Sequence, residues 1–350
     1  MRSIINDMIK LWSEAVVTGK PDWITPNTRE TDNNAYALLN FTNTEKRKQI
    51  PVLILPPQAG HHSCIVDFGS PEQSLVSTCI HNTKSPVYAI EWKNSIRKDE
   101  SIDDLVRYVD ECVEKIGGKA VLTGLCQGGW LAAVYASLYP EKVKAMLLGA
   151  APIDFTAGGG KLQDMVQNIP LSQYKMFVLQ GGGILPGKTL LAGWKLTNAY
   201  DRYIGDYLAM FNNIVDDERI KKTRQFRTWY EYTQDISGKW YIQAVKKLFK
   251  GNYLIKKKLA VMGEIIDLEK INCPVALIAG EKDDITLKPQ MFNMVDHIST
   301  EKEKIIKITI PESGHIGVFM RTKSQPYWIE ALNFIFDSLN DGNRKYKNAA

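Results

Sequence analysis

Short apolar runs alternate along the chain with longer segments in which apolar residues recur every three or four positions. The short runs are rich in Val, Ile and Leu and predict buried strands over residues 49–57, 85–92, 119–125, 143–154, 273–280 and 303–311. The longer segments predict helices over residues 100–118, 128–140, 288–299 and 327–339. Strands that alternate with helices favour an α/β fold, in which a doubly wound, mostly parallel sheet has helices on both faces.

This alternation stops in the middle of the chain and then resumes. Residues 156–262 contain helical periodicity, many tyrosines and three of the eight tryptophans. We expect this segment to be a helical cap inserted into one core, which is formed by residues 46–155 and 263–340. Residues 1–45 are expected to be an N-terminal helical segment, and residues 341–350 a flexible tail. An inserted cap would cover the carboxyl ends of the strands, where open α/β sheets place their ligands.

Composition and charge narrow the kinds of protein that the chain can be. The longest apolar stretches are far shorter than the ~20 residues that a membrane-spanning helix needs, and charges interrupt the N-terminal apolar positions. The five cysteines form no C-x-x-C pair and no metal-binding pattern, so we expect a reducing cytoplasm and no bound metal. The net charge of +5 is concentrated in residues 239–258, which hold seven lysines. We interpret this segment as a solvated helix face or as a surface that docks on something anionic or amphiphilic, and not as a nucleic-acid site.

The segment GLCQG, residues 124–128, predicts a nucleophile. It has the form G-x-nucleophile-x-G between a predicted strand and a predicted helix, which is the pattern of the nucleophile elbow. Glycines permit a sharp turn that would point the Cys126 side chain away from the sheet, and the following helix N-terminus favours a thiolate. The other four cysteines, Cys64, Cys79, Cys112 and Cys273, are expected to be buried structural thiols.

A thiol nucleophile needs a base, and the base needs an acceptor that orients it. Asp283 follows the predicted strand at 273–280, and His315 follows the next strand, so the order along the chain is nucleophile, acid, histidine. Asp284 competes with Asp283 for the role of the acid. We therefore predict a triad of Cys126, His315 and Asp283.

Further residues are expected around this triad. The backbone N–H of Gln127, with a second N–H near Gly60 or His61 in the loop after the first core strand, would hold an oxyanion. His62, Trp130 and Trp194 are weaker candidates for contact with substrate. His81 and His297 are expected to have structural roles.

Residues 182–189 match the phosphate-binding pattern G-x-x-x-x-G-K-[ST] letter for letter. Pro186 removes one backbone N–H of a phosphate cradle, and the match lies inside the expected cap. We therefore interpret it as a coincidental match and expect no nucleotide cofactor.

With these motifs in place, the chain resembles the branch of the α/β-hydrolases that contains polyhydroxyalkanoate synthases and intracellular polyhydroxyalkanoate depolymerases, both of which use cysteine as nucleophile. The resemblance to the shorter, class III synthases lies in GLCQGGW, LYPEKVKAML, PIDF, DLEKINCPV and SGHIGVF. The resemblance to the depolymerases covers more of the chain, in VLILPPQAGHH, PGKTLLAGW, DISGKWYIQAV, GEKDDIT and GHIGVF. Two departures argue against opposite functions. Synthases usually have a histidine where this chain has Asp284, which argues against a synthase. Depolymerases typically have a proline where this chain has Gly128 and Gly129, which argues against a depolymerase.

The resemblance implies an enzyme that acts on hydroxyacyl esters through an acyl-thioester on Cys126, with no cofactor. By the extent of the match we favour an intracellular depolymerase. The alternative is a synthase that polymerises (R)-3-hydroxyacyl-CoA, and a further alternative is a non-catalytic granule-binding protein. The substrate would be the ester polymer or the coenzyme A thioester, in the cytoplasm and at the surface of a polymer granule. A homo-oligomer and a partner subunit both stay open.

Overall fold

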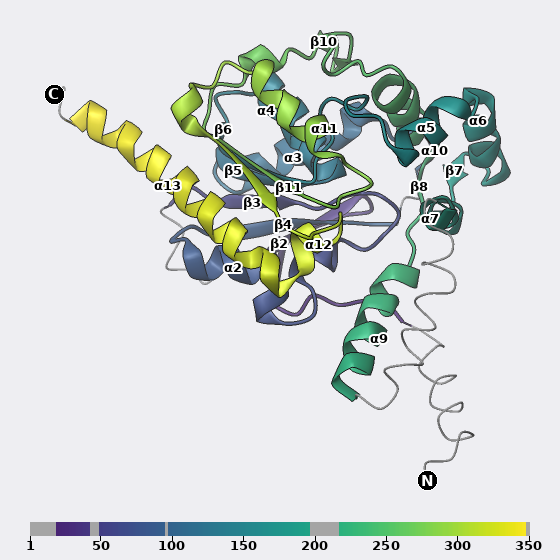
Figure 1. The fold of residues 1–350 in the computed structure, drawn as a ribbon, viewed down its shortest axis with the longest axis horizontal. Helices are drawn as coiled ribbons and strands as arrows, with labels where there is room; N and C mark the ends of the chain where they lie inside the picture. The colour runs from purple at the N-terminus through teal and green to yellow at the C-terminus, as the bar shows by residue number, and fades with distance from the viewer. Residues whose placement is uncertain (1–18, 43–48, 95–96, 197–216, 348–350) are drawn as a thin grey trace.

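A computed structural model describes residues 19–42, 49–94, 97–196 and 217–347. Within these residues, eight strands form one sheet in the order β1-β2-β4-β3-β5-β6-β11-β12 (Figure 1). Neighbouring strands from β4 to β12 are parallel, whereas β2 is antiparallel to both β1 and β4. The expected mostly parallel sheet is therefore confirmed. The bounds of its strands are β1 Thr28–Asp32, β2 Tyr36–Asn40, β3 Val52–Leu55, β4 Val87–Trp92, β5 Ala120–Leu125, β6 Val143–Gly149, β11 Val275–Gly280 and β12 Ile305–Ile310.

Helices cover both faces of this sheet, because successive side chains of each strand point to opposite sides. Leu53 and Leu55 of β3 face one core cluster, which contains α3 and α4. Val52 and Ile54 face a second cluster, which contains α2, α12 and α13. The sheet is therefore doubly wound, as the alternation of strands and helices predicts. The helices around the sheet are α2 Leu75–Asn82, α3 Ile102–Lys115, α4 Gln127–Leu138, α11 Lys288–Phe292, α12 Gly317–Met320 and α13 Gln325–Lys347, with short turns η2 Ser63–Asp67, η3 Pro71–Gln73, η6 Leu268–Lys270, η7 Asn293–Asp296, η8 Lys302–Lys304 and η9 Thr322–Ser324.

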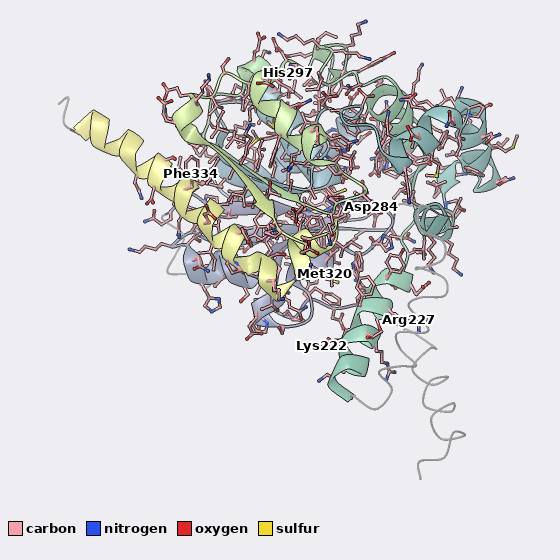
Figure 2. All side chains as sticks on the ribbon, in the orientation of Figure 1. Lys222, Arg227, Asp284, His297, Met320 and Phe334 are labelled. Atoms are coloured by element: carbon pink, nitrogen blue, oxygen red, sulfur yellow. The ribbon has the colours of Figure 1, made fainter. Side chains whose placement is uncertain are left out.

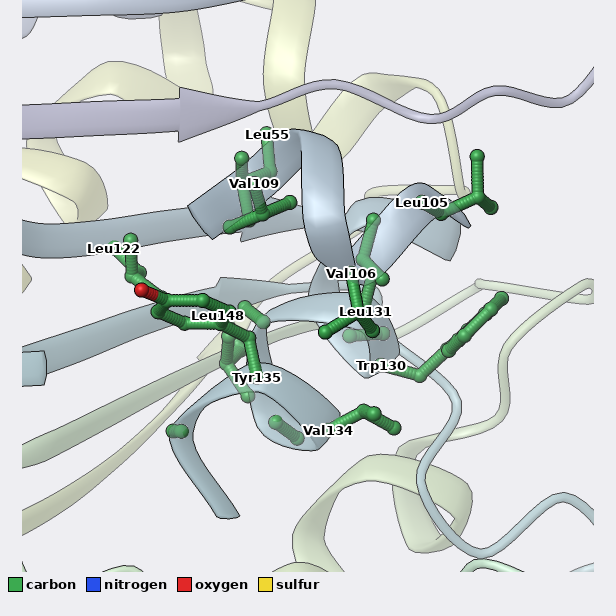
Figure 3. Packing of buried hydrophobic residues seen from close by; sticks show 14 of the residues in the cluster. Leu55, Leu105, Val106, Val109, Leu122, Trp130, Leu131, Val134, Tyr135 and Leu148 are labelled. Atoms are coloured by element: carbon green, nitrogen blue, oxygen red, sulfur yellow. The ribbon is translucent and has the colours of Figure 1, made fainter. Parts of the chain in front are cut away.

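Helix α4 is the most deeply buried of the helices beside the sheet, since nearly all its side chains lie in the core. Figure 3 shows Leu131 and Tyr135 of α4 among residues of α3 and of the strands. The hydroxyl of Tyr135 donates to Asp110 at 2.8 Å, so the helix carries one polar contact at the edge of an otherwise apolar interface. This packing fixes the helix that begins directly after Cys126.

Two boundary predictions are wrong. Residues 28–40 are not helical: they form strands β1 and β2, in which Tyr36–Asn40 is entirely buried and the Asn33 side chain accepts hydrogen bonds from the N–H groups of Ala35 and Tyr36 in the turn. The run Tyr36–Asn40 is only five residues long, which is too short to indicate a strand next to the longer helical pattern of the N-terminal residues. The helical prediction for residues 1–18 falls outside the described residues. The predicted tail begins too early, because α13 continues to Lys347.

The segment between β6 and β11 is mainly helical but also contains short strands. Its helices are α5 Lys161–Asn168, α6 Leu171–Gln180, α7 Gly187–Leu196, α9 Asp217–Glu231, α10 Gly238–Gln243 and the π-helix η5 Ala244–Lys250. Two antiparallel pairs join β7 Ile184–Leu185 to β8 Ile236–Ser237 and β9 Ala260–Val261 to β10 Glu264–Ile265. A purely helical cap is therefore too simple a prediction. Figure 1 shows α5, α6, α7 and α10 grouped at one end of the sheet, with α9 projecting from the body. None of the helices in the described ranges has the length and apolarity needed to span a membrane.

Candidate active site

Cys126 lies in the turn between β5 and α4, and its backbone has the unusual conformation φ 49°, ψ −115°. A residue with a side chain rarely adopts a positive φ, at a cost on the order of 1–3 kcal/mol, and such strain concentrates at functional sites. The turn is held on both sides, since the Cys126 N–H donates to the Gly149 carbonyl and its own carbonyl accepts from the Gly129 N–H, each at 2.9 Å. This geometry is that of a nucleophile elbow.

The glycines around Cys126 are required by close approach of the backbone. A Cβ added to Gly128 would lie 1.9 Å from the Leu55 carbonyl oxygen at the end of β3. A Cβ added to Gly129 would lie 2.2 Å from the Ala151 Cβ, after β6. The elbow is therefore wedged between the ends of the two strands that flank β5, and this is why the sequence needs Gly-Gly at this point.

The loops after β11 and β12 bring Asp283 and His315 together. These strands are parallel neighbours, so their carboxyl ends meet at the same edge of the sheet. The N–H of Lys282 donates to the Ser313 carbonyl at 2.9 Å, which joins the two loops directly. His315 Nδ1 then lies 2.9 Å from Asp283 Oδ2 and 3.1 Å from Oδ1.

The choice between Asp283 and Asp284 is made by burial. Asp283 is buried, and its Oδ1 also accepts hydrogen bonds from the N–H groups of Ile285 and Thr286, each at 2.9 Å. Asp284, labelled in Figure 2, is exposed. Asp283, and not Asp284, is therefore the carboxylate in contact with the histidine.

The surroundings of His315 favour its protonated form. Burial lowers the pKa of His315, but the charges of Asp283 and Cys126 and the hydrogen bonds to both side chains raise it, and the net pKa lies well above the usual value. Because Nδ1 faces Asp283, Nε2 is the nitrogen left for the thiol. The three predicted triad residues are thus brought together in the order Asp283, His315, Cys126.

Two cavities meet at Cys126. One, of about 60 Å³, is lined by His315 and by residues that include His61, Trp229 and Tyr230. The other, of about 30 Å³, has Leu162, Phe249 and Gln290 among its lining residues. Helix α9 contributes to the first cavity, and α5 and η5 to the second. The segment between β6 and β11 therefore contributes to both cavities at Cys126.

The predicted oxyanion donors are only partly brought to the site. Gln127 opens α4, so its N–H belongs to the unpaired first turn of the helix. Its side-chain Oε1 accepts from the Gln58 N–H at 2.6 Å, which fixes the loop after β3 against the elbow. Neither Gly60 nor Gln127 is among the described residues that line the two cavities. The Gly60 carbonyl accepts from the Gln234 N–H at 2.8 Å, which joins the loop after β3 to the inserted segment. His61 does line the larger cavity.

The two neighbouring histidines are held by aromatic residues of α9 and by the loop itself. The His61 ring stacks on Trp229 and Tyr230, with centroids 4.8 and 5.4 Å away, and its ring nitrogen contacts the Tyr230 carbonyl at 3.1 Å. His62 Nδ1 accepts from the Cys64 N–H, and its Nε2 lies 3.8 Å from buried Glu91. Burial lowers the pKa of each histidine to about 4, so both rings are neutral at pH 7.

Trp130, a predicted substrate contact, does not lie at the two cavities around Cys126. It lies on α4 in the core cluster beside Leu105 and Val106 of α3 (Figure 3). Helix α4 is buried on nearly all sides, so a large side chain on it can pack into the core. Trp130 does this against α3 and therefore points away from Cys126. His62 does line the larger cavity. The side chain of Trp194 lies outside what the structure describes.

Several residues that line the site were not predicted. Tyr230, Ile316 and Phe319 line the larger cavity, and Phe155 and Phe249 the smaller one. Ile316 and Phe319 follow His315 within one helical turn, so their closeness to a predicted site residue could have indicated them. No such indication exists for the residues of the inserted segment, because their approach to Cys126 depends on packing between distant parts of the chain.

The remaining motifs have structural explanations. Cys64, Cys79 and Cys112 are buried and Cys273 is half-buried, and burial raises the pKa of Cys79 and Cys273 to about 12. In the phosphate-binding pattern, the Gly187 N–H donates to the Asp235 carboxylate at 2.8 Å, so an anion already occupies that donor. Within the described ranges, no group of three or more His, Cys, Asp or Glu side chains has a geometry suited to a metal ion.

Comparison with solved structures defines the class of fold. A carboxylesterase from Nitrososphaera gargenis superposes with a TM-score of 0.55 at 15% identity, covering 90% of this chain and 100% of the esterase chain. An esterase from Thermogutta terrifontis gives a TM-score of 0.51 at 15% identity, covering 90% and 99%. The protein has an α/β-hydrolase fold. The chain belongs to the family described as "Protein of unknown function (DUF3141)", whose model matches residues 27–335.

Curated relatives carry the name of a polymerase. The "Poly(3-hydroxyalkanoate) polymerase subunit PhaC" of Haloferax mediterranei is 28% identical over 309 residues, which are 86% of this chain and 61% of that protein. The subunit of the same name from Thiocystis violacea is 26% identical over 251 residues, 69% of each chain. The chain spans about three fifths of the length of the Haloferax relative and 58% of a Haloarcula marismortui relative of the same name. The resemblance to the polyhydroxyalkanoate synthases is thus confirmed.

Proposed function

We propose that the chain is an acyltransferase that forms a hydroxyacyl thioester on Cys126 and transfers the acyl group to the hydroxyl end of a growing polyester. The observation that carries this proposal is a cysteine at the strained elbow, beside a histidine held by a buried carboxylate. A serine at this position would indicate an ordinary esterase. The names of the curated relatives support polymerisation as the overall reaction.

The proposed chemistry uses only the side chains and amides of the chain. His315 accepts the Cys126 proton at Nε2, and the sulfur attacks the carbonyl carbon of a hydroxyacyl-coenzyme A thioester. The Gln127 N–H and an N–H from the loop after β3 would hold the negative oxygen of the tetrahedral intermediate. The coenzyme A thiolate then leaves and takes the proton from His315. Asp283 keeps the imidazole oriented and stabilises its positive charge throughout.

The second step decides between making and breaking a polymer. In a synthase, His315 takes the proton of a chain-end hydroxyl, and the resulting oxygen attacks the thioester at Cys126. In a depolymerase, water takes that place after the enzyme has cleaved a polymer ester. The sequence favoured the depolymerase, but the relatives named above are polymerase subunits, so we place the synthase first. Asp284, where synthases usually have a histidine, is the feature that favours the second candidate.

A single-turnover experiment tests the first step separately from polymer formation. Purified protein is mixed with (R)-3-hydroxybutyryl-coenzyme A, quenched in acid and weighed as intact protein by mass spectrometry. We expect the mass of one hydroxybutyryl group on the wild type and none on Cys126→Ala. Acylation of Cys126→Ala to the same extent would contradict the assignment of the nucleophile. Because only one turnover is observed, acylation is measured without any requirement for polymer formation.

Product analysis then separates the two candidate functions. With the thioester as substrate, a synthase releases free coenzyme A and leaves insoluble polyester. With amorphous polyester as substrate, a depolymerase releases hydroxy acid. Neither product from either substrate, with no acylation of Cys126, would favour the remaining alternative, a non-catalytic granule-binding protein.

We propose that the protein acts in the cytoplasm on the surface of polymer inclusions, through helix α6. Met176 and Leu179 of this helix are 51% and 71% exposed, an unusual position for two large apolar side chains on one short helix. A polyester inclusion offers an apolar surface on which both side chains can be buried.

A further inference from the structure

A large apolar cavity lies among the helices of the inserted segment, apart from the two cavities at Cys126. Its volume is about 330 Å³, and among its described lining residues are Val166, Leu185, Leu190 and Val245. An apolar cavity of less than half this size, about 150 Å³, is enough to bind benzene in a protein engineered to contain one. The cavity therefore has room for a flexible aliphatic chain.

Tyr174 of α6 contributes a polar atom to this cavity. Its side chain lines the cavity and is 6% exposed, and its hydroxyl is buried without a hydrogen-bond partner among the described residues. Its ring packs edge-on against Tyr241, with centroids 6.2 Å apart, so its orientation is fixed. Burial raises the pKa of Tyr174, and the hydroxyl therefore keeps its proton and can donate it. An unpartnered buried hydroxyl costs free energy that a ligand with an acceptor oxygen would recover.

Leu162 and Phe249 separate this cavity from the nucleophile. Both residues line the large cavity and also the small cavity that contains Cys126. Phe249 is held against Phe155 by an edge-to-face contact, with centroids 4.9 Å apart. The large cavity is thus one layer of side chains away from the reacting sulfur.

We propose that this cavity is a binding site for an aliphatic chain that carries one hydrogen-bond acceptor, an alkyl ester being the simplest such ligand. The chain would lie against the apolar walls, and its carbonyl oxygen would accept the hydrogen bond of the Tyr174 hydroxyl. The proposal does not depend on acyl transfer, because it concerns binding without reaction. Its experiments therefore use Cys126→Ala, in which the nucleophile is absent.

The first experiment tests the hydrogen bond. Binding of methyl octanoate and of 1-chlorooctane is measured by calorimetry for Cys126→Ala and for the same protein with Tyr174→Phe. We expect Tyr174→Phe to weaken methyl octanoate binding roughly fivefold to tenfold, the value of one hydrogen bond, and to leave 1-chlorooctane binding unchanged. Equal affinity of the two proteins for the ester would overturn the proposed role of Tyr174.

The second experiment tests the location. Gly193 of α7 lines the cavity, and a Cβ added there meets no atom within 4 Å, so Gly193→Leu can place a side chain in the open space. We expect it to weaken binding of both ligands at least tenfold. Ser172→Leu is the matched control, since Ser172 is an exposed residue of α6 outside the lining, and it should bind both ligands as before. Unchanged binding by a folded Gly193→Leu protein would overturn the proposed site.

Thermal unfolding without ligand gives an independent readout. Removing an unpaired buried hydroxyl should leave the melting temperature of the Tyr174→Phe protein equal to or above that of its parent. A marked fall would show that the hydroxyl already has a structural partner, and would contradict the proposal. Loss of acylation at Cys126, by contrast, would leave all these results intact and would bear only on the proposed function.

Discussion

At the scale of single residues, the assignment of Asp283 over Asp284 is the most direct one to test. Asp283→Asn keeps the shape of the side chain but removes the charge beside His315 Nδ1, so the imidazole loses both its orientation and its stabilised positive charge. We expect the single-turnover acylation rate of Cys126 to fall by about 100-fold or more. Asp284→Asn is the matched control and should remain within about twofold of the wild type, because its side chain is exposed. Similar losses in both variants would contradict the assignment.

The raised pKa of His315 has a consequence for stability. When a histidine has a higher pKa in the folded protein than in the unfolded chain, the folded state binds the proton more tightly. The resulting stability is fully present below the unfolded value of 6.5 and is lost as the pH rises through the folded pKa. In the wild type, where Asp283 and Cys126 both raise this pKa, we expect the free energy of unfolding to fall as the pH is raised above about 6.5.

Urea denaturation at a series of pH values measures this effect. Asp283→Asn removes the charge that raises the pKa of His315 most strongly. The fall in stability with pH should therefore be smaller in this variant. Parallel pH profiles for the two proteins would show that Asp283 does not set the protonation of His315.

The residues of the triad were predictable because their chemistry is written in local sequence. The segment GLCQG predicts a sharp turn between a strand and a helix. Asp283 and His315 each follow an apolar run, and these two runs form strands that end at the same edge of the sheet. The residues expected around the triad were harder to predict, because the identity of a residue does not show which way its side chain points. Trp130 is close to Cys126 along the chain but faces the core, and Gly60 lies in the expected loop but outside the lining of the cavities.

At the scale of the elements, the elbow depends on how closely β3 and α4 approach each other. Gly128→Ala would place a Cβ 1.9 Å from the Leu55 carbonyl, and the backbone of a central strand cannot move aside. We expect a loss of about 2–3 kcal/mol in the free energy of unfolding, measured with urea. Gly193→Ala is the control: its Cβ meets open space within a helix, so it should be neutral or stabilising by up to about 1 kcal/mol. Equal stability of the two variants would contradict this account of the elbow.

The wall between the cavities gives a second prediction at this scale. Phe249 belongs to η5 and lines both the small cavity at Cys126 and the large apolar cavity. Phe249→Ala should join the two and let a longer acyl chain extend from the sulfur. We expect acylation by 3-hydroxyoctanoyl-coenzyme A to rise roughly tenfold relative to the 3-hydroxybutyryl thioester. Phe249→Leu keeps most of the wall and should show a much smaller change. An unaltered ratio for the alanine variant would mean that the acyl chain leaves by another route.

Elements were predictable where their periodicity was sustained over their whole length. Helix α3 and the buried parallel strands have clear patterns, and their boundaries were predicted to within a few residues. The hairpin of β1 and β2 was missed because five residues give too little pattern, and its strand character depends on pairing with β4. The two-residue strands β7 to β10 form only because distant segments meet, which no local pattern can indicate.

At the scale of the whole molecule, the order of strands, loops and inserted segment explains how residues far apart in the sequence come together around one thiol. The carboxyl ends of β5, β11 and β12 bring Cys126, Asp283 and His315, the proposed nucleophile, acid and base, to the same edge of the sheet. The inserted segment supplies Trp229 to one cavity at Cys126 and Phe249 to the other. The sequence predicts that an insertion lies over this edge, but Trp229 and Phe249 line the cavities at Cys126 although each is more than one hundred positions away along the chain.

The exposed apolar side chains of α6 predict that the protein binds to the surface of polyester inclusions. If α6 docks on polyester inclusions, burial of the exposed parts of Met176 and Leu179 would contribute about 1–2 kcal/mol each, enough to shift the protein from solution to the surface. Replacing both by glutamine should lower the fraction of protein that sediments with isolated inclusions several-fold, while single-turnover acylation of Cys126 is unchanged. Ile265→Gln is the control, since Ile265 is 52% exposed but lies on β10, outside α6. If the double variant and the control sediment alike, contact with the inclusion does not pass through α6.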